Sequence, residues 1–180
     1  YATINDIKLD VDIDGSGFIP FEDKMISTPV CFVLHGGPGL DHTYFKPWLN
    51  PLREQMQLVY IDLRGNGLSS RTSPDTYTLE QMADDLETLR KYLGLDKISL
   101  LGHSFGGMLA QVYATIYPGN ISKLILVTTT SHGGFLTEQN DESNNVSQAT
   151  LTKEQLEMSP KLFEGRLKDD VELKKWWDIM

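Results

Sequence analysis

The stretch ISLLGHSFGG at residues 98–107 decides the fold of this chain. Residues 98–101 form a short, mostly apolar run, which is typical of a strand buried on both faces. Residues 105–117 place apolar side chains at helical spacing. Between them lies the pattern G-x-S-x-G, centred on Ser104, in the context that a nucleophile elbow requires. The stretch therefore predicts that Ser104 is a nucleophile; the alternative is a glycine-rich turn around an inert serine.

The backbone of this turn has an expected role of its own. A turn this sharp brings the strand and the helix into contact, so side chains at Gly102 and Gly106 would clash. We expect Ser104 to be held in a strained conformation with its Oγ exposed. Because a helix begins here, the N–H of Phe105 is predicted to point toward charge that develops on a substrate oxygen.

A second glycine-rich turn, HGGPG at residues 35–39, follows the apolar run at residues 30–34. Open α/β sheets bind ligands beyond the carboxyl ends of their strands, where both turns are expected. An acyl-transfer enzyme needs two N–H donors for the oxyanion, one from the elbow and one from such a loop. We expect Gly37 to supply the second donor, with Pro38 stiffening the loop. The two turns together predict an acyl-transfer or related hydrolase site; two plain βα turns are the alternative.

The spacing of apolar residues predicts an α/β fold with a doubly wound, mostly parallel sheet. Buried strands are expected at four apolar runs, residues 30–34, 58–61, 98–101 and 124–127. Helices are expected at residues 78–93 and 105–117. Residues 2–13 alternate apolar and polar side chains, which predicts an N-terminal antiparallel hairpin. Residues 18–29 contain prolines and show no clear period, so a loop is expected there.

The predicted helix at residues 78–93 carries signals at both ends. Thr78 and Gln81 have the spacing of a capping box, and Gly94 stands where a left-handed C-terminal cap is expected. The apolar residues fall on one stripe, which is expected to face the core. Three acidic side chains lie off this stripe and are expected to face solvent: Asp84, Asp85 and Glu87.

Three motifs together resemble the α/β-hydrolase fold family: HGGPG at 35–39, DLRGNGLS at 62–69 and GHSFGG at 102–107. The HGGPG form is similar to the prolyl aminopeptidase (proline iminopeptidase) branch and its esterase relatives. The resemblance covers residues 2–131. Members of that branch often carry Gln before the nucleophile and Trp after it, where this chain has His103 and Phe105.

The resemblance implies roles for particular residues. Ser104 would be the nucleophile, and the N–H groups of Gly37 and Phe105 would form the oxyanion hole. The DLRGNGLS stretch would be a structural loop near the site, with no catalytic role for Asp62. Neither a cofactor nor a metal ion is implied.

The family places its catalytic acid and base after the serine in chain order. After Ser104 the only histidine is His132, just past the run at 124–127, whereas the family places its base after the last strand. We therefore expect the acid and the base beyond Met180; His132 is the alternative base.

The same comparison implies a division of the chain. Residues 1–134 would be the N-terminal part of the hydrolase core, and residues 135–180 would begin a helical cap in which Trp176 and Trp177 pack or line a substrate pocket. The C-terminal part of the core would then be a partner that turnover requires. Residues 1–180 alone are not expected to turn over substrate.

Composition excludes several classes of function. With 16 basic and 25 acidic residues, the net charge of −9 argues against nucleic acid or an anionic membrane surface as a partner. No apolar run approaches the roughly 18 residues of a membrane span. The single cysteine, Cys31, excludes an internal disulfide and a cysteine-rich zinc site, and its apolar neighbours predict a core residue. No basic-then-apolar leader opens the sequence, and a cytoplasmic location is expected.

Residues 12–23 match much of an EF-hand calcium loop, with Asp12, Asp14 and Ser16 at ligand spacing. The strand-like segment before them and Pro20 within them favour the end of a hairpin instead. Calcium binding is the alternative.

Two classes of function are compatible with these residues. The first is a serine hydrolase that acts through an acyl-enzyme, removing an N-terminal residue such as proline from short peptides or cleaving a small ester or lactone. The second is an incomplete, non-catalytic hydrolase-fold module that binds a ligand. A small molecule or a short peptide is the expected partner in both cases.

Overall fold

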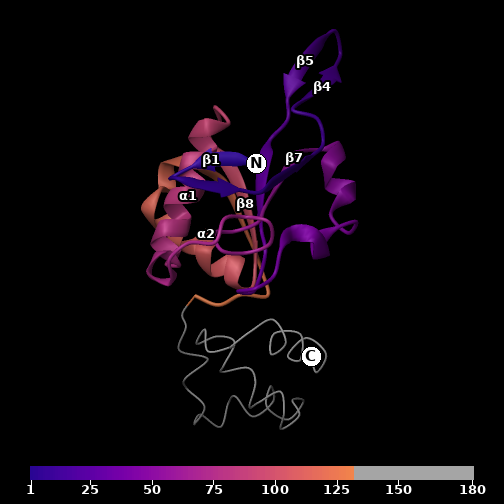
Figure 1. Ribbon diagram of the computed structural model, residues 1–180. Coiled ribbons are helices and arrows are strands. Elements are labelled where there is room, and N and C mark those ends of the chain that lie inside the picture. The colour runs from indigo at the N-terminus through magenta and orange to yellow at the C-terminus, as the bar shows by residue number, and fades with distance from the viewer. Residues whose placement is uncertain (132–180) are drawn as a thin grey trace, which may run out of the picture. The chain divides into compact units, whose positions relative to one another are not determined.

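A five-stranded sheet lies at the centre of the described structure (Figure 1). The computed structural model describes residues 1–131. The strands stand in the order β3 (Val11–Asp14), β7 (Gln57–Ile61), β6 (Val30–Leu34), β8 (Ile98–His103) and β9 (Ile121–Val127). β3 runs antiparallel to β7, and the other neighbouring strands are parallel. All four apolar runs form strands, which confirms the predicted mostly parallel sheet.

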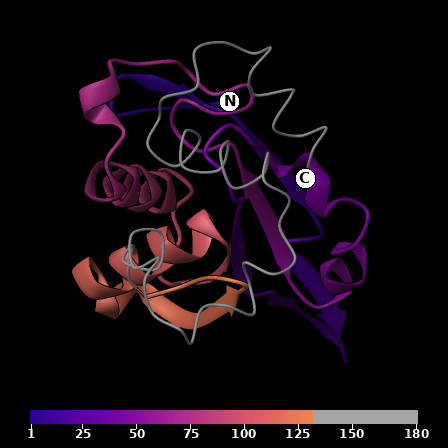
Figure 2. The same ribbon diagram turned by 90° about the horizontal axis from the view of Figure 1, so that it is seen from below.

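Helical segments cover both faces of this sheet (Figures 1 and 2). They are α1 (Leu79–Tyr92), α2 (Phe105–Ile116) and four 3-10 turns, η1 (His42–Phe45), η2 (Asn50–Glu54), η3 (Pro74–Thr76) and η4 (Pro118–Asn120). Successive side chains of a strand point to opposite faces. Phe32 of β6 therefore packs in the cluster that includes α1 and α2, whereas Cys31 lies in the cluster with Phe45 of η1. Both predicted helices are confirmed.

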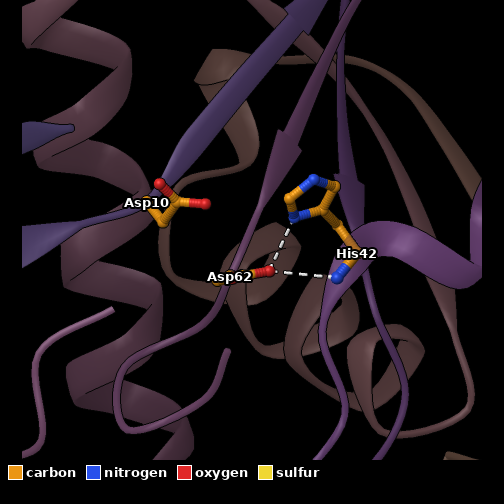
Figure 3. A group of neighbouring side chains, drawn as sticks. All are labelled: Asp10, His42 and Asp62. Carbon is orange, nitrogen blue, oxygen red and sulfur yellow. Dashed lines mark hydrogen bonds and ion pairs between the residues drawn. The ribbon is translucent and has the colours of Figure 1, made fainter. Parts of the chain in front are cut away.

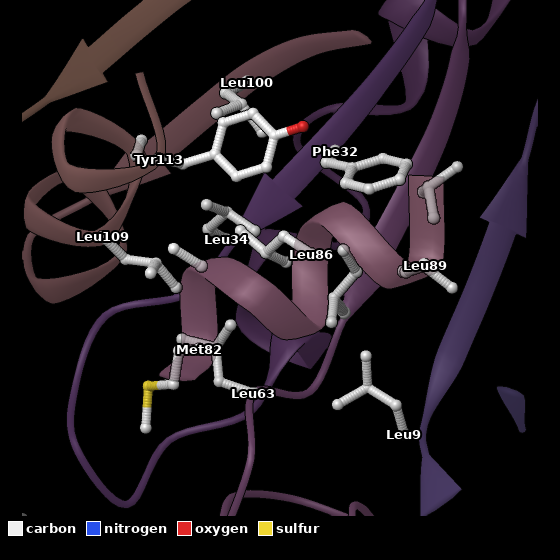
Figure 4. Close-up of a cluster of buried hydrophobic side chains, with 14 of the residues drawn as sticks. Leu9, Phe32, Leu34, Leu63, Met82, Leu86, Leu89, Leu100, Leu109 and Tyr113 are labelled. Atoms are coloured by element: carbon white, nitrogen blue, oxygen red, sulfur yellow. The ribbon is translucent and has the colours of Figure 1, made fainter. Parts of the chain in front are cut away.

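The larger hydrophobic core lies between the sheet and the helices α1 and α2 (Figure 4). Leu86 and Leu89 of α1 are buried in one cluster with Tyr113 of α2. Burial of one such side chain is worth about 1.5–3 kcal/mol. On the opposite face, burial raises the pKa of the Cys31 thiol to about 12, and its predicted place in the core is confirmed.

Thr78 and Gly94 cap α1 as predicted, although the Gln81 side chain donates to Asp85 and does not complete the capping box. Two of the acidic residues of α1 do not lie where they were expected. The N–H of Gln81 donates to Thr78 Oγ1 at 3.1 Å, and Gly94 has a φ of +67°. Asp85 and Glu87 are only 2% and 4% exposed, so the expectation that they face solvent is wrong.

Asp85 and Glu87 are buried because each has a cationic partner. Arg64 donates two hydrogen bonds of 2.7 Å to the Asp85 carboxylate. Arg90 donates to both oxygens of Glu87, at 2.9 and 2.8 Å, and the Tyr113 hydroxyl donates to the same carboxylate at 2.8 Å. A stripe of apolar residues does not reveal such partners, because Arg64 arrives from a loop that is 21 residues away in sequence.

Glu87 should make the stability of the fold depend on acid. The hydrogen bond from Arg90 is the main cause that lowers the pKa of Glu87 from 4.5 to about 2. Because the folded pKa lies below the unfolded value, this stabilisation is complete above pH 4.5 and is lost as the pH falls toward 2. Between pH 4.5 and 2, the free energy of unfolding should fall by about 3 kcal/mol more in the wild type than in Glu87→Gln. Urea denaturation at several pH values measures this difference. The exposed control Glu80→Gln should keep the wild-type acid dependence; an unchanged dependence in Glu87→Gln would contradict the prediction.

The N-terminal hairpin is confirmed. β1 (Ala2–Ile4) pairs antiparallel with β2 (Ile7–Leu9), and the turn residues Asn5 and Asp6 have φ values of 43° and 61°. These positive φ angles suit the short polar side chains of Asn and Asp.

A second hairpin stands where a loop was expected. β4 (Phe18–Phe21) pairs antiparallel with β5 (Lys24–Ser27), and the hairpin projects away from the sheet (Figure 1). The expectation of a loop at residues 18–29 is therefore wrong. Both faces of this hairpin carry apolar side chains, which removes the alternation that signals a strand. Pro20 is tolerated because each strand of a two-stranded hairpin is paired along one edge only.

The stretch with EF-hand spacing, residues 12–23, runs through β3 and this hairpin. Lys46 Nζ lies 2.5 Å from an Asp12 oxygen and 3.2 Å from an Asp14 oxygen. The carboxylates thus serve as partners of a lysine, and the stretch is interpreted as the end of a strand and a hairpin. Among the described residues, none of the helices has the length and hydropathy that crossing a membrane requires.

Candidate active site

Ser104 occupies the turn between β8 and α2 and is half-buried. Its φ of 51° and ψ of −117° are rarely adopted by a residue with a side chain. The turn is tight on both sides: a Cβ on Gly102 would lie 2.4 Å from the Gly106 carbonyl oxygen, and one on Gly106 would lie 2.3 Å from the Leu34 carbonyl oxygen. The backbone therefore has the sharp, strained geometry that the nucleophile elbow was predicted to need.

The strained conformation of Ser104 is held in place from the neighbouring strand. Its N–H donates to the Val127 carbonyl oxygen at 3.0 Å, and its own carbonyl accepts from Thr129 Oγ1 at 2.7 Å. Such a conformation costs about 1–3 kcal/mol and persists only where the surroundings over-determine it. Phe105 is the first residue of α2, so its N–H is among those that have no acceptor within the helix.

The HGGPG loop lies directly against the elbow, because β6 and β8 are neighbours and pair Leu34 with Gly102. A Cβ on Gly36 would lie 3.2 Å from Ser104 Cβ, an approach that only glycine allows without displacement. The N–H of Gly36 already donates to the Tyr44 hydroxyl at 2.7 Å. Gly36 is buried and Gly37 is half-buried, so the second donor remains a prediction for the Gly37 N–H and not for that of Gly36.

His35 determines the direction of the Gly37 N–H. The N–H of Leu63 donates to His35 Nε2 at 3.0 Å, so this nitrogen is an acceptor and the ring proton resides on Nδ1. Nδ1 lies 2.6 Å from the Gly36 carbonyl oxygen and donates to it. The Gly36 carbonyl and the Gly37 N–H belong to one trans peptide and point in opposite directions, so the hydrogen bond to one orients the other.

Because His35 is neutral in the folded protein, it should make the stability of the protein depend on pH. Burial lowers the pKa of this imidazole from 6.5. A protonated ring would in addition lose the hydrogen bond from the Leu63 N–H, because Nε2 could no longer accept. With a folded pKa below the unfolded one, the unfolded chain binds the extra proton, and stability is lost as the pH falls below 6.5. As the pH is lowered from 7 to 5, the unfolding temperature should fall less in His35→Gln than in the wild type. Equal losses in the two proteins would count against this role of His35.

The DLRGNGLS stretch supports the HGGPG loop, as the structural role predicted for it requires. Asn66 Oδ1 accepts from the Gly39 N–H at 2.7 Å. Asp62 Oδ1 accepts from both the backbone N–H and Nδ1 of His42, at 3.0 and 2.7 Å (Figure 3), and Oδ2 accepts from the Leu68 N–H at 2.8 Å. Asp62 is therefore occupied in holding η1 against the end of β7.

Asp10, His42 and Asp62 have ligand atoms within 4.8 Å of one another, a spacing compatible with a metal ion (Figure 3). The donor set argues for another interpretation. Both oxygens of Asp62 accept N–H hydrogen bonds, and the Nδ1 of His42 is one of the donors. We therefore interpret this cluster as a hydrogen-bonding network that anchors η1.

Ser104 and Phe105 follow β8, and Gly37 lies in the loop after β6, next to Gly36, which approaches Ser104. Sequence reasoning missed Tyr44, whose isolated position in a 3-10 turn carries no motif. Within residues 1–131, no histidine is hydrogen-bonded to the Ser104 side chain: His35, His42 and His103 bind other partners. The alternative base His132, and the tryptophans at 176 and 177, lie outside the described residues.

Residues 29–170 match the family model described as alpha/beta hydrolase fold, and the chain belongs to this family. Among curated proteins it is similar to the proline iminopeptidase PfmaB of Pestalotiopsis fici, with 43% identity over 102 residues, which are 54% of this chain and 35% of that protein. It is also similar to the proline iminopeptidase of Lactobacillus helveticus, with 40% identity over 116 residues, 62% of this chain and 39% of that protein. The chain thus spans less than two fifths of the length of these relatives.

Solved structures show the same fold with other activities. The esterase EaEST from Exiguobacterium antarcticum superposes with a TM-score of 0.58 at 30% identity, covering 69% of this chain and 42% of that one. The enol-lactonase from Burkholderia xenovorans LB400 superposes with a TM-score of 0.62 at 25% identity, covering 72% and 46%.

Proposed function

We propose that this chain carries the nucleophile and the oxyanion hole of a serine hydrolase that resembles prolyl aminopeptidases. The observation that carries the proposal is the strained Ser104, with a φ of 51°, against which the HGGPG loop packs through Gly36. The relatives named proline iminopeptidase, at 40% and 43% identity, support a short peptide as the substrate.

In the proposed mechanism, Ser104 Oγ attacks the carbonyl carbon of the residue to be released, and a base accepts the hydroxyl proton. The N–H groups of Gly37 and Phe105 stabilise the negative charge on the carbonyl oxygen. Cleavage of the C–N bond releases the amine, which takes the proton, and leaves an ester on Ser104. Water then hydrolyses this acyl-enzyme by the reverse sequence of proton transfers. We place the base and its orienting carboxylate outside residues 1–131.

A second substrate class has specific support. The esterase and the enol-lactonase superpose on 69% and 72% of this chain, and the same acyl-enzyme route cleaves a small ester or lactone. The proposal of another class, a non-catalytic binding module, predicts that Ser104 does not react.

A fluorophosphonate probe tests the proposal on the full-length native protein. We expect covalent labelling of Ser104, identified by peptide mass spectrometry, because the probe reports an activated serine next to an oxyanion hole. Hydrolysis of proline 4-nitroanilide and of 4-nitrophenyl acetate should then separate peptidase from esterase activity. An unlabelled Ser104 in a folded protein that still binds proline peptides would favour the binding module.

A further inference from the structure

We infer that Tyr44 is a positioning residue for the oxyanion hole, because its hydroxyl bridges the HGGPG loop and the residue that precedes the nucleophile. The Tyr44 oxygen lies 2.7 Å from the Gly36 nitrogen and 2.8 Å from His103 Nδ1. The inference rests on the function proposed above, in which the Gly37 N–H faces the developing charge.

The chemistry of the three groups indicates the direction of both hydrogen bonds. A backbone N–H can only donate, so the Tyr44 oxygen accepts from Gly36. The hydroxyl proton is then free to donate to His103 Nδ1, which makes this nitrogen an acceptor and places the ring proton of His103 on Nε2. Burial lowers the pKa of His103, which favours the neutral ring that this arrangement requires.

Ring packing holds the Tyr44 side chain between Gly36 and His103. Its ring lies 4.3 Å from the Phe45 ring and 5.6 Å, edge to face, from the His103 ring, measured between centroids. The 3-10 turn that carries Tyr44 is capped by Asp41, whose Oδ1 accepts from the Thr43 N–H at 2.8 Å. The Asp62–His42 network holds the same turn against the sheet (Figure 3).

Hydrogen bonds fix both backbone groups of Gly36 in the HGGPG loop. Tyr44 binds the N–H of Gly36, and His35 binds the carbonyl of Gly36, so the peptide that presents the Gly37 N–H is restrained at each end of Gly36. Without the hydroxyl, the Gly36 N–H would lose its acceptor and the loop could turn relative to Ser104. An oxyanion donor acts on the transition state, so its displacement should lower kcat rather than raise KM.

The test compares Tyr44→Phe with Tyr77→Phe in the full-length native protein. The two side chains are similarly exposed, at 37% and 39%, and each hydroxyl makes two hydrogen bonds, those of Tyr77 being to the backbone of Thr72. We expect Tyr44→Phe to lower kcat, and the rate of fluorophosphonate labelling, by about tenfold or more with KM within about twofold. Tyr77→Phe should retain the wild-type rates.

Variants of His103 distinguish a positioning role of the Tyr44 hydroxyl from a general loss of stability. His103→Gln keeps an acceptor for the Tyr44 proton and should retain most of kcat, whereas His103→Ala should fall toward the rate of Tyr44→Phe. In ¹⁵N spectra, the Nδ1 resonance of His103 should show an unprotonated acceptor in the wild type and should shift in Tyr44→Phe.

The outcomes distinguish this inference from the proposed function. Wild-type kcat and labelling rates in Tyr44→Phe would overturn the positioning role while Ser104 still reacts. Equal losses in Tyr44→Phe and Tyr77→Phe would overturn it as well, because they would report a general loss of stability. Failure of Ser104 to react in the wild type would instead overturn the proposed function.

Discussion

Ser104→Ala is expected to lower kcat by about 10⁴-fold or more in the full-length native protein, with little effect on the fold. The strained turn holds Ser104 between the ends of β8 and α2 and against Gly36, so no other hydroxyl can replace it there. The removal of Oγ leaves the proposed oxyanion donors, the N–H groups of Gly37 and Phe105, and hence a small residual rate above that of water is expected. Steady-state hydrolysis of proline 4-nitroanilide or 4-nitrophenyl acetate, whichever the wild type cleaves, measures the effect.

The matched control is Ser73→Ala, which removes an exposed serine hydroxyl from a loop. It should retain the wild-type kcat and the fluorophosphonate labelling. Ser104→Ala should also unfold at a urea concentration close to that of the wild type or above it, because alanine leaves the backbone strain unchanged. Turnover by Ser104→Ala at more than a tenth of the wild-type rate would exclude Ser104 as the nucleophile.

Gly106→Ala is expected to destabilise the protein by about 3 kcal/mol or more. The added Cβ would lie 2.3 Å from the Leu34 carbonyl oxygen and 2.6 Å from the His35 carbonyl oxygen. Both are backbone atoms at the end of a buried strand, so they cannot rotate away as the tip of a side chain can. Relief of the clash must move either α2 or the start of the HGGPG loop, and we expect kcat to fall together with stability.

Urea denaturation of Gly106→Ala and of the control Gly119→Ala measures this effect. An added Cβ on Gly119 meets no atom of the described structure within 4 Å, so that substitution should change stability by no more than about 0.5 kcal/mol. Similar unfolding midpoints for the two variants would show that the contact between the elbow and β6 is looser than this geometry implies.

Local sequence patterns were sufficient for most of the fold and for the strained turn at Ser104. The apolar runs, the Thr78 cap of α1 and the glycine cap after it depend on neighbouring residues, and all of them form as predicted. The elbow and the HGGPG loop are also local, because glycine at a given position permits a turn that other residues would forbid. The C-terminal ends of adjacent parallel strands then bring Ser104 and Gly37 to one edge of the sheet.

Patterns failed where the partner of a side chain comes from a distant segment. The buried carboxylates of Asp85 and Glu87 look like solvated residues until Arg64 is seen beside the first and Tyr113 beside the second, 21 and 26 residues away in sequence. The hairpin at β4 and β5 was missed because apolar side chains on both of its faces hide the strand period.

The sequence by itself determined the class of fold and the position of the strained serine. These properties follow from the chemistry of single residues and from short-range spacing. Only the tertiary structure decided which groups of the HGGPG loop are already hydrogen-bonded: the Gly36 N–H donates to the Tyr44 hydroxyl, and the His35 ring donates to the Gly36 carbonyl. Hydrogen bonds between segments that are far apart in the chain have no period in the sequence, so their partners become known only when the chain is folded.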